Sequence, residues 1–235
     1  EYGSYIAWGE TETATKSRYD WSTYKFQADF IGDNKTSLDP EDDAAHVNWG
    51  GDWIMPSPDD FDELKQNCTC TWTKQNDVNG YKITGSNGKS IFLPAAGFRV
   101  GGGLYVVSIV GLYWSSLLDD SDAGYVLDFN GGGQFETLYT RHNRSEGMPV
   151  RPVCPSAGNT NGHVAVDLGL PSGKLWAECN IGADAPESYG SYIAWGETED
   201  KEIYYWSTYK YMQEGKSNEI FINKYQVPDN EYGGI

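Results

Sequence analysis

The sequence has no long apolar run and a marked shortage of basic residues. Its most apolar stretch, Leu104–Trp114, is interrupted by Ser108 and Gly111 and is shorter than the ~20 residues of a membrane-spanning helix. Lys and Arg total 17 against 34 Asp and Glu, which gives a net charge of −17. Nucleic acids and anionic membranes attract basic residues that neutralise phosphates, so we expect no nucleic-acid partner and no membrane insertion.

Cysteine and histidine are too scarce and too scattered to predict a metal site. The chain has 4 cysteines and 3 histidines, too few for a disulfide scaffold. Cys68 and Cys70 are separated by a single residue, whereas zinc sites typically separate such a pair by about two to four. We therefore expect structural thiols or one disulfide, with no bound metal and no cofactor.

An internal repeat is the most informative feature that is present. Residues Tyr2–Glu12, YGSYIAWGETE, recur letter for letter at Tyr189–Glu199, and the WSTYK of Trp21–Lys25 recurs at Trp206–Lys210. The copies are separated by the length of a whole domain, far beyond the roughly 20 to 50 residues of a solenoid repeat. The sequence therefore predicts a window cut across an array of whole domains.

The repeat divides the chain into parts of two tandem units. We expect residues 1–154 to be the C-terminal part of one unit, 155–163 a linker or hairpin, and 164–235 the N-terminal part of the next unit. Residues 1–32 then duplicate 188–235. Two arrangements stay open. Each partial unit is completed head to tail by another copy, which we favour, or the two parts close on each other as one permuted domain.

The first expected helix covers residues 39–48, DPEDDAAHVN. It starts with proline and acidic residues, which suit the positive N-terminus of a helix, and it places its apolar side chains inward, Val47 included. Asp42 and Asp43 would also suit a calcium loop, but ligands at regular spacing are missing, which favours helix-start electrostatics.

A second helix and a series of short strands follow. Ser57 as N-cap, with proline next and an acidic residue at the box position, predicts a helix that ends near Asn67. Asn79-Gly80 and Asn87-Gly88 are typical hairpin turns. Residues 97–147 are expected to contain little regular structure, as in long functional loops. Strands are expected at 72–74, 81–85, 90–93, 113–116, 125–129, 149–153, 164–168 and 175–177.

Several long blocks of the sequence are similar to one known family. The blocks are VDLGLPSGKLWAECNIGA (166–183), YGSYIAWGET (189–198), DDAAHVNWGGDWIMPSPDDFDEL (42–64), NGYKITGSNGKSIFLPAAGFR (79–99), GLYWSS (111–116) and MPVRPV (148–153). In these blocks the chain resembles the Fibrobacter succinogenes major paralogous domain family, which is abundant on surface proteins of gut Bacteroidetes. The family's opening block comes last here.

The resemblance implies a fold and a location. The fold is C-type lectin-like, an α+β domain with two helices, small antiparallel sheets and a long loop region. In it the first and last strands pair, so GHVAVDL is expected beside MPVRPV. The location is extracellular or the cell surface. The segment between GFR and RPV also resembles the variable region of retroelement-diversified proteins, which display interchangeable side chains around a YWSS core.

A binding face is expected between Val100 and His142. Large aromatic residues and arginine dominate protein-contact energies because they bury much area at little rotamer cost. Some of these residues would instead fill the core, as we expect for Trp114, Leu127 and Phe129. The candidate ligand-binding residues are Tyr105, Leu112, Leu117, Asp119, Tyr125, Phe135, Tyr139, Arg141 and His142.

The repeated aromatic block allows two interpretations. Stacked Trp and Tyr side chains suit carbohydrate faces. The recurrence of Trp8 as Trp195 and of Trp21 as Trp206 favours core or inter-unit packing instead.

No pattern in the chain predicts catalysis. Gly101–Gly103 and Gly131–Gly133 lack the strand-to-helix context of a phosphate loop. We therefore expect a non-enzymatic ligand-binding or adhesion module whose partners are other copies of itself, assembled head to tail, and a protein or glycan ligand. The alternative is a purely structural repeat of a surface fibre, whose loops contact neighbouring copies.

Overall fold

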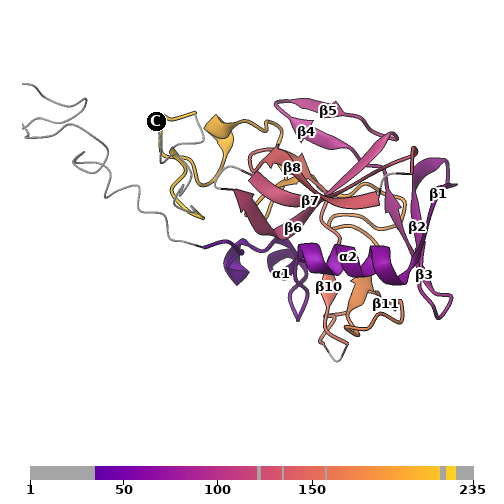
Figure 1. Ribbon diagram of the computed structural model, residues 1–235. Helices are drawn as coiled ribbons and strands as arrows, with labels where there is room; N and C mark the ends of the chain where they lie inside the picture. The colour runs from indigo at the N-terminus through magenta and orange to yellow at the C-terminus, as the bar shows by residue number, and fades with distance from the viewer. Residues whose placement is uncertain (1–34, 121–122, 134, 157, 218–220, 226–235) are drawn as a thin grey trace, which may run out of the picture.

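Two short helices and small antiparallel sheets make up the fold. We describe residues 35–120, 123–133, 135–156, 158–217 and 221–225 of a computed structural model (Figure 1). The helices are α1 (Ala44–Trp49) and α2 (Pro58–Asn67). The strands are β1 (Thr69–Gln75), β2 (Val78–Thr84), β3 (Ser90–Pro94), β4 (Phe98–Val100), β5 (Gly103–Tyr105), β6 (Val110–Asp120), β7 (Ala123–Asn130), β8 (Phe135–Asn143), β9 (Gly147–Met148), β10 (Val153–Cys154), β11 (Ala165–Asp167), β12 (Leu175–Ala177) and β13 (Ile193–Ala194). The expected α+β class is confirmed.

Helix α2 begins and ends as the sequence predicts. The Ser57 hydroxyl accepts from the Asp60 backbone N–H at 3.3 Å, and the Asp60 carboxylate accepts from the Ser57 N–H at 2.9 Å. This reciprocal capping box satisfies donors that the first helical turn leaves without partners. Phe61 and Leu64 are fully buried, so the inward face of the helix is also confirmed.

Helix α1 is shorter than expected. A 3₁₀ turn, Pro40–Asp42, precedes it, and Asp43 caps it by accepting from the Ala45 and His46 backbone N–H groups. The prediction of helix-start electrostatics is therefore confirmed for Asp43. Val47 was predicted to point inward, and this was wrong, because its side chain is 48% exposed.

Strands β1, β2 and β3 form one sheet in which the turns are partly as predicted. Asn87-Gly88 lies in the β2–β3 turn, as expected, with Gly88 at φ 82°. The β1–β2 turn is instead Asn76-Asp77, with φ of 47° and 66°, and Asn79-Gly80 lies inside β2. Asn and Asp adopt this left-handed backbone more readily than other side chains, so Asn76-Asp77 competes with Asn-Gly for the turn.

The sheet with the longest strands occupies the segment that was predicted to be mostly loop. Strands β6, β7 and β8 run antiparallel in that order and cover most of residues 110–143. The prediction of little regular structure over 97–147 was therefore wrong. Its glycine runs lie in tight turns between strands: Gly101 and Gly102 join β4 to β5, and Gly131–Gly133 follow β7.

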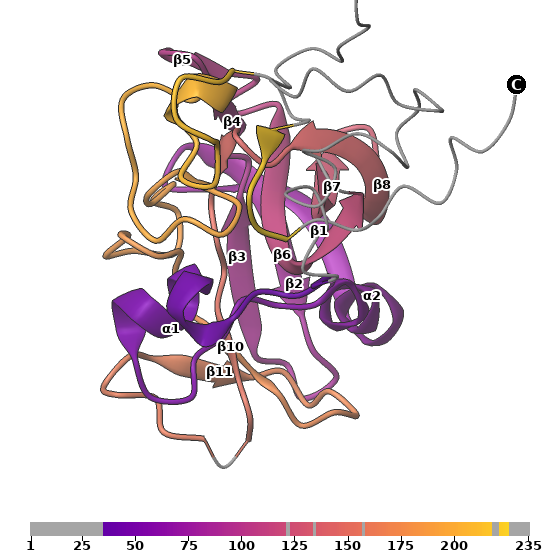
Figure 2. The same cartoon turned by 90° about the vertical axis from the view of Figure 1, so that its left-hand side faces the viewer.

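Segments on both sides of residues 155–163 complete the same sheets. Strand β12 pairs with both β10 and β11, and β13 pairs with β9 in the sheet ordered β13-β9-β4-β5. The expected direct pairing of GHVAVDL with MPVRPV is corrected, because β12 lies between β10 and β11. In Figures 1 and 2 the β4–β5 hairpin and the β10–β11 strands lie at opposite ends.

Two buried clusters hold the body together, and both draw on the two sides of the chain. The first contains Trp53 and Trp114 beside Trp195 and Tyr225, and the second contains Phe61 and Phe129 beside Trp176. Residues 35–154 and 164–225 therefore close on each other within one chain, the arrangement that the sequence left as the alternative. Trp114, Leu127 and Phe129 are fully buried, as predicted.

Candidate functional site

Exposed apolar side chains gather on the β4–β5 hairpin and the turn after it. Leu104, Tyr105, Val106 and Ile109 are 42%, 48%, 40% and 61% exposed. A cluster of large exposed apolar residues is unusual on a soluble protein and commonly marks a contact surface. We call the following set the apolar edge: Leu104, Tyr105, Val106, Ile109, Ile203 and Tyr205.

The backbone beneath these side chains is strained. Val106 and Ser108 adopt positive φ angles of 49° and 63°. A β-branched residue such as valine rarely adopts this conformation, and strain of this kind costs about 1–3 kcal/mol. The Ser108 N–H donates to the Ala95 carbonyl at 2.8 Å, which fixes the turn. The fold thus holds Val106 at the surface at an energetic cost.

Residues 203–205, which lie between the two recurring blocks of the C-terminal copy, supply the other side of the apolar edge. Gly101 and Tyr204 exchange two backbone hydrogen bonds of 2.7 and 2.8 Å, which places Ile203 and Tyr205, 43% and 55% exposed, beside the β4–β5 turn. A Cβ on Gly101 would lie 2.4 Å from the Tyr205 hydroxyl. The Tyr205 ring thus packs over Gly101, whose φ of 56° also favours glycine at this position.

The apolar edge includes an edge strand. Strand β5 is the outermost strand in the sheet order β13-β9-β4-β5 as the described residues define it. An edge strand can add an extended peptide from a partner through backbone hydrogen bonds, while its side chains fill pockets on that partner. The apolar edge thus offers both backbone and side-chain contacts.

The residues predicted for the binding face do not form one surface. Tyr105 belongs to the apolar edge, but Leu112 and Phe135 are only 2% and 6% exposed and lie in the two core clusters, so their assignment to a contact surface was wrong. Their positions in long strands turn both side chains inward.

The remaining predicted residues lie elsewhere on the sheet. Leu117 and Tyr125 are partly buried, and Leu117 forms a β-bridge with Ser37. The His142 imidazole is 2.8 Å from the Glu146 carboxylate and packs edge-on against Phe98 at 5.4 Å. The side chains of Asp119, Tyr139 and Arg141 are outside those that the structure describes.

Sequence reasoning missed most of the apolar edge. Leu104, Val106 and Ile109 belong to the most apolar run of the chain, LYVVSIV, whose composition is that of a core strand. Only the fold shows that this run forms an edge strand and a turn. Ile203 and Tyr205 gave a weaker signal, since they lie between the two blocks that the repeat shares.

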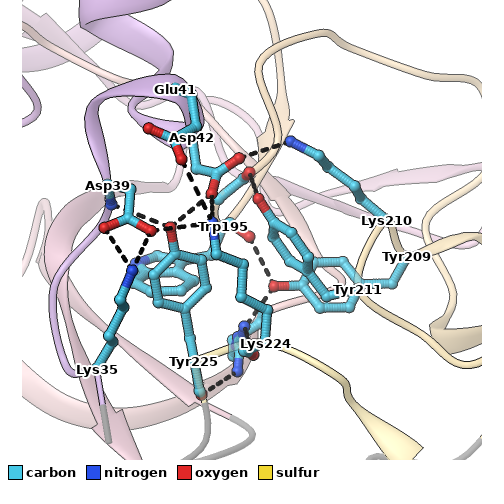
Figure 3. Close-up of polar contacts among 12 residues, drawn as sticks. Lys35, Asp39, Glu41, Asp42, Trp195, Tyr209, Lys210, Tyr211, Lys224 and Tyr225 are labelled. Atoms are coloured by element: carbon cyan, nitrogen blue, oxygen red, sulfur yellow. Dashed lines mark hydrogen bonds and ion pairs between the residues drawn. The ribbon is translucent and has the colours of Figure 1, made fainter. Parts of the chain in front are cut away.

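A second site, which is polar, joins Lys210, Lys224 and Tyr225 to the turn before α1 (Figure 3). Asp42, 2% exposed, accepts hydrogen bonds from Lys210 at 2.7 Å, from the Tyr225 hydroxyl at 2.6 Å and from Lys224. Asp39 accepts from Lys35 at 2.6 Å and pairs with Lys224 at 3.0 Å. We call Asp39, Asp42 and these partners the acidic clamp.

Electrostatics favour the charged forms in the acidic clamp. Burial alone raises the pKa of Asp42, but the hydrogen bonds from Lys210 and Lys224 outweigh burial and hold that pKa well below its usual range. Burial lowers the pKa of Lys224, yet its bonds to Asp42 and Asp39 raise it above the usual range. Each charge therefore stabilises the other.

The turn that carries Asp39 and Asp42 has enough carboxylates for a metal site, but two of them are paired with lysines. Asp39, Glu41 and Asp42 bring carboxylate oxygens within 4.8 Å of one another. Lysine ammonium groups already neutralise Asp39 and Asp42. The carboxylates thus anchor Lys210, Lys224 and Tyr225 to the turn before α1.

Comparisons with known proteins add no assignment. No family model, curated protein or solved structure matches the chain. In the described residues no helix has the length and apolar character needed to cross a membrane.

Proposed function

We propose that the chain is a non-enzymatic binding module of an extracellular or cell-surface protein, and that it presents the apolar edge to a protein ligand. The observation that carries the proposal is the group of exposed apolar side chains at Leu104 and Tyr105 of β5 and at Val106 and Ile109 of the strained turn that follows. The resemblance to a surface-protein family with a C-type lectin-like fold supports the location and the class of function.

The chemistry of the apolar edge favours protein over glycan. Four of its six residues are aliphatic, and aliphatic side chains gain free energy by packing into apolar pockets. Glycan recognition needs polar groups converging on hydroxyls beside a planar aromatic face. A short edge strand adds backbone pairing, which is a recurrent mode of peptide recognition.

The structural repeat of a surface fibre is the second candidate function. It is favoured by one observation: the segment that completes this body, residues 189–210, has a near copy at residues 2–25 of the same chain. Copies that complete one another through a head-to-tail contact form open chains when the contact does not close into a ring. In this case the ligand of the module is another copy of itself.

Retention on an immobilised panel of extracellular-matrix proteins and glycans tests the proposal. We expect Ile109→Asp to remove retention on a protein that holds the wild type, because a charge within an apolar contact is desolvated without a partner. Val47→Asp is the matched control, since Val47 is similarly exposed on α1. Retention that Ile109→Asp leaves intact, or retention on glycans alone, contradicts a protein-binding apolar edge.

A further inference from the structure

The C-terminal copy of the repeat is built into the core of the body. Trp195 is fully buried, its indole N–H donates to the Ser115 carbonyl at 3.0 Å, and its backbone N–H donates to the Arg144 carbonyl at 2.9 Å. The Arg144 guanidinium lies 4.8 Å from the Trp195 ring centroid. A buried tryptophan with both N–H groups satisfied is a strong anchor.

Further contacts of this copy come from the block YGSYIAWGETE. Ile193 and Ala194 pair with β9, and the Ile193 carbonyl accepts from the Trp114 indole at 2.8 Å. The Tyr192 hydroxyl donates to the Ala96 carbonyl at 2.7 Å. We call the body residues that make these contacts the cradle: Ala96, Trp114, Ser115, Arg144, Gly147 and Met148, with Asp42 of the acidic clamp.

The WSTYK block adds a second set of contacts. The Tyr209 hydroxyl donates to the Trp195 carbonyl at 2.7 Å and accepts from the Arg144 Nε at 2.9 Å. Lys210 is the partner of Asp42 at 2.7 Å. Both shared blocks therefore contribute contacts to the cradle.

The N-terminal copy carries the same side chains. Tyr5, Ile6, Ala7 and Trp8 correspond to residues 192–195 in the letter-for-letter repeat. In the second block, Tyr24 and Lys25 correspond to Tyr209 and Lys210. Counting back from that block, Tyr19 stands where the buried Tyr204 stands. Every cradle contact named above therefore has its donor or acceptor in residues 2–25.

The tether between the N-terminal copy and the body is long enough to reach the cradle. Nine residues, 26–34, separate Lys25 from Lys35, and an extended chain of that length spans up to ~30 Å. Lys35 lies 2.6 Å from Asp39, and Lys210, the counterpart of Lys25, lies 2.7 Å from Asp42 in the same turn. Docking within the same chain is therefore geometrically possible and is helped by a high effective concentration.

We propose that the cradle accepts either copy of the repeat. When the C-terminal copy, residues 189–210, dissociates from the cradle, residues 2–25 of the same chain take its place. The C-terminal copy holds the cradle more strongly, because Arg144 also donates to the Tyr225 and Lys224 carbonyls at 2.8 and 3.0 Å. Phe26, at the position of Tyr211, lacks the hydroxyl that donates to the Gly196 carbonyl at 2.8 Å.

The exchange changes the chemistry of the apolar edge. Counting back from WSTYK, Arg18 and Asp20 stand where Ile203 and Tyr205 stand. Docking of the N-terminal copy would therefore replace two exposed apolar side chains beside the β4–β5 turn with two charged ones. This consequence rests on the proposed function of the apolar edge, whereas the exchange itself does not.

Thermal unfolding of four full-length chains tests the exchange. The chains are the wild type, Trp8→Ala, Trp195→Ala and the double variant, followed by far-ultraviolet circular dichroism. We expect Trp8→Ala alone to leave the Tm unchanged. Trp195→Ala should lower it only in part, because Trp8 takes the vacated place. The double variant should lose on the order of 10 °C, as expected for an unfilled tryptophan site. Lys16→Ala combined with Trp195→Ala is the control and should match Trp195→Ala alone.

Two results overturn the exchange. The first is a Trp195→Ala chain with the same Tm as the double variant, which would show that Trp8 does not fill the vacated place. The second is a Trp8→Ala loss of equal size in both backgrounds, which would place Trp8 in another site. Because the assay needs no ligand, its failure is distinct from a failure of the apolar edge to bind protein.

Discussion

Replacing Asp42 with asparagine isolates the electrostatic contribution of the acidic clamp. The side chain is nearly the same size, but it loses the charge that accepts from Lys210, Lys224 and Tyr225. Removing one member of a buried ion pair costs about 3–5 kcal/mol. The side chains of Lys210 and Lys224 are 45% and 27% exposed and can hydrate, so we expect the lower limit, about 3 kcal/mol. The corresponding Tm shift is on the order of 10 °C.

The pH dependence follows from the direction of the Asp42 pKa shift. The folded-state pKa lies below the usual value of 3.8, so the folded state binds the proton less readily than the unfolded state does. The stabilisation is then fully present above the unfolded-state pKa and is lost as the pH falls through the folded-state value. The difference between wild type and Asp42→Asn should be constant above about pH 5 and should shrink below about pH 4.

Urea unfolding followed by tryptophan fluorescence at neutral pH and near pH 3 measures both effects. Glu41→Gln is the matched control in the same turn. The Glu41 side chain is 71% exposed, and its carboxylate makes a single long contact of 3.9 Å with Lys224. We expect this substitution to change the free energy of unfolding by less than about 0.5 kcal/mol. An Asp42→Asn loss below about 1 kcal/mol, or one that is equal at both pH values, refutes a clamp based on charge.

Two further substitutions probe the packing of the body by the same urea assay. Gly111→Ala should cost about 1–3 kcal/mol of unfolding free energy, because the new Cβ would lie 2.0 Å from the Phe129 ring. Gly102→Ala is the control, since a Cβ there would have its nearest neighbour at 3.5 Å. Equal losses at both positions would contradict this explanation. Arg151→Lys should cost about 3 kcal/mol, since the fully buried guanidinium donates to Asn180 and to the Glu178 and Phe92 carbonyls at 2.8, 2.8 and 2.9 Å; an unchanged midpoint would show that a lysine ammonium satisfies the same acceptors.

Local signals in the sequence predicted local structure well. Helix α2 is specified by Ser57, Pro58 and Asp60, which act within one turn of chain. The two early helices likewise follow from local patterns, whereas the burial of Trp114 was implied by the resemblance of its block, GLYWSS, to the family. The β1–β2 turn was misplaced by three residues because two adjacent pairs, Asn76-Asp77 and Asn79-Gly80, both suit a hairpin.

Non-local pairing accounts for what the sequence could not predict. The glycines of residues 97–147 were interpreted as loop, yet the long ladder of β6 with β7 lies between them. Whether an apolar strand is central or at an edge depends on its partners, so LYVVSIV could not be recognised as an exposed surface. Leu112 and Phe135 were assigned to the binding face between Val100 and His142, because aromatic and large aliphatic residues occur both in cores and in contact surfaces.

Hydrogen exchange at the joining amides tests the central claim, that residues 164–225 complete the body of residues 35–154 within one chain. The amides of Ala177, Ile181 and Trp195 donate to the carbonyls of Pro152, Val150 and Arg144 at 2.9, 3.1 and 2.9 Å. At a concentration where the mass in solution is that of one chain, we expect these amides to exchange as slowly as those of β7. Rapid exchange in the monomer, with protection only in larger assemblies, would show that another chain completes the body.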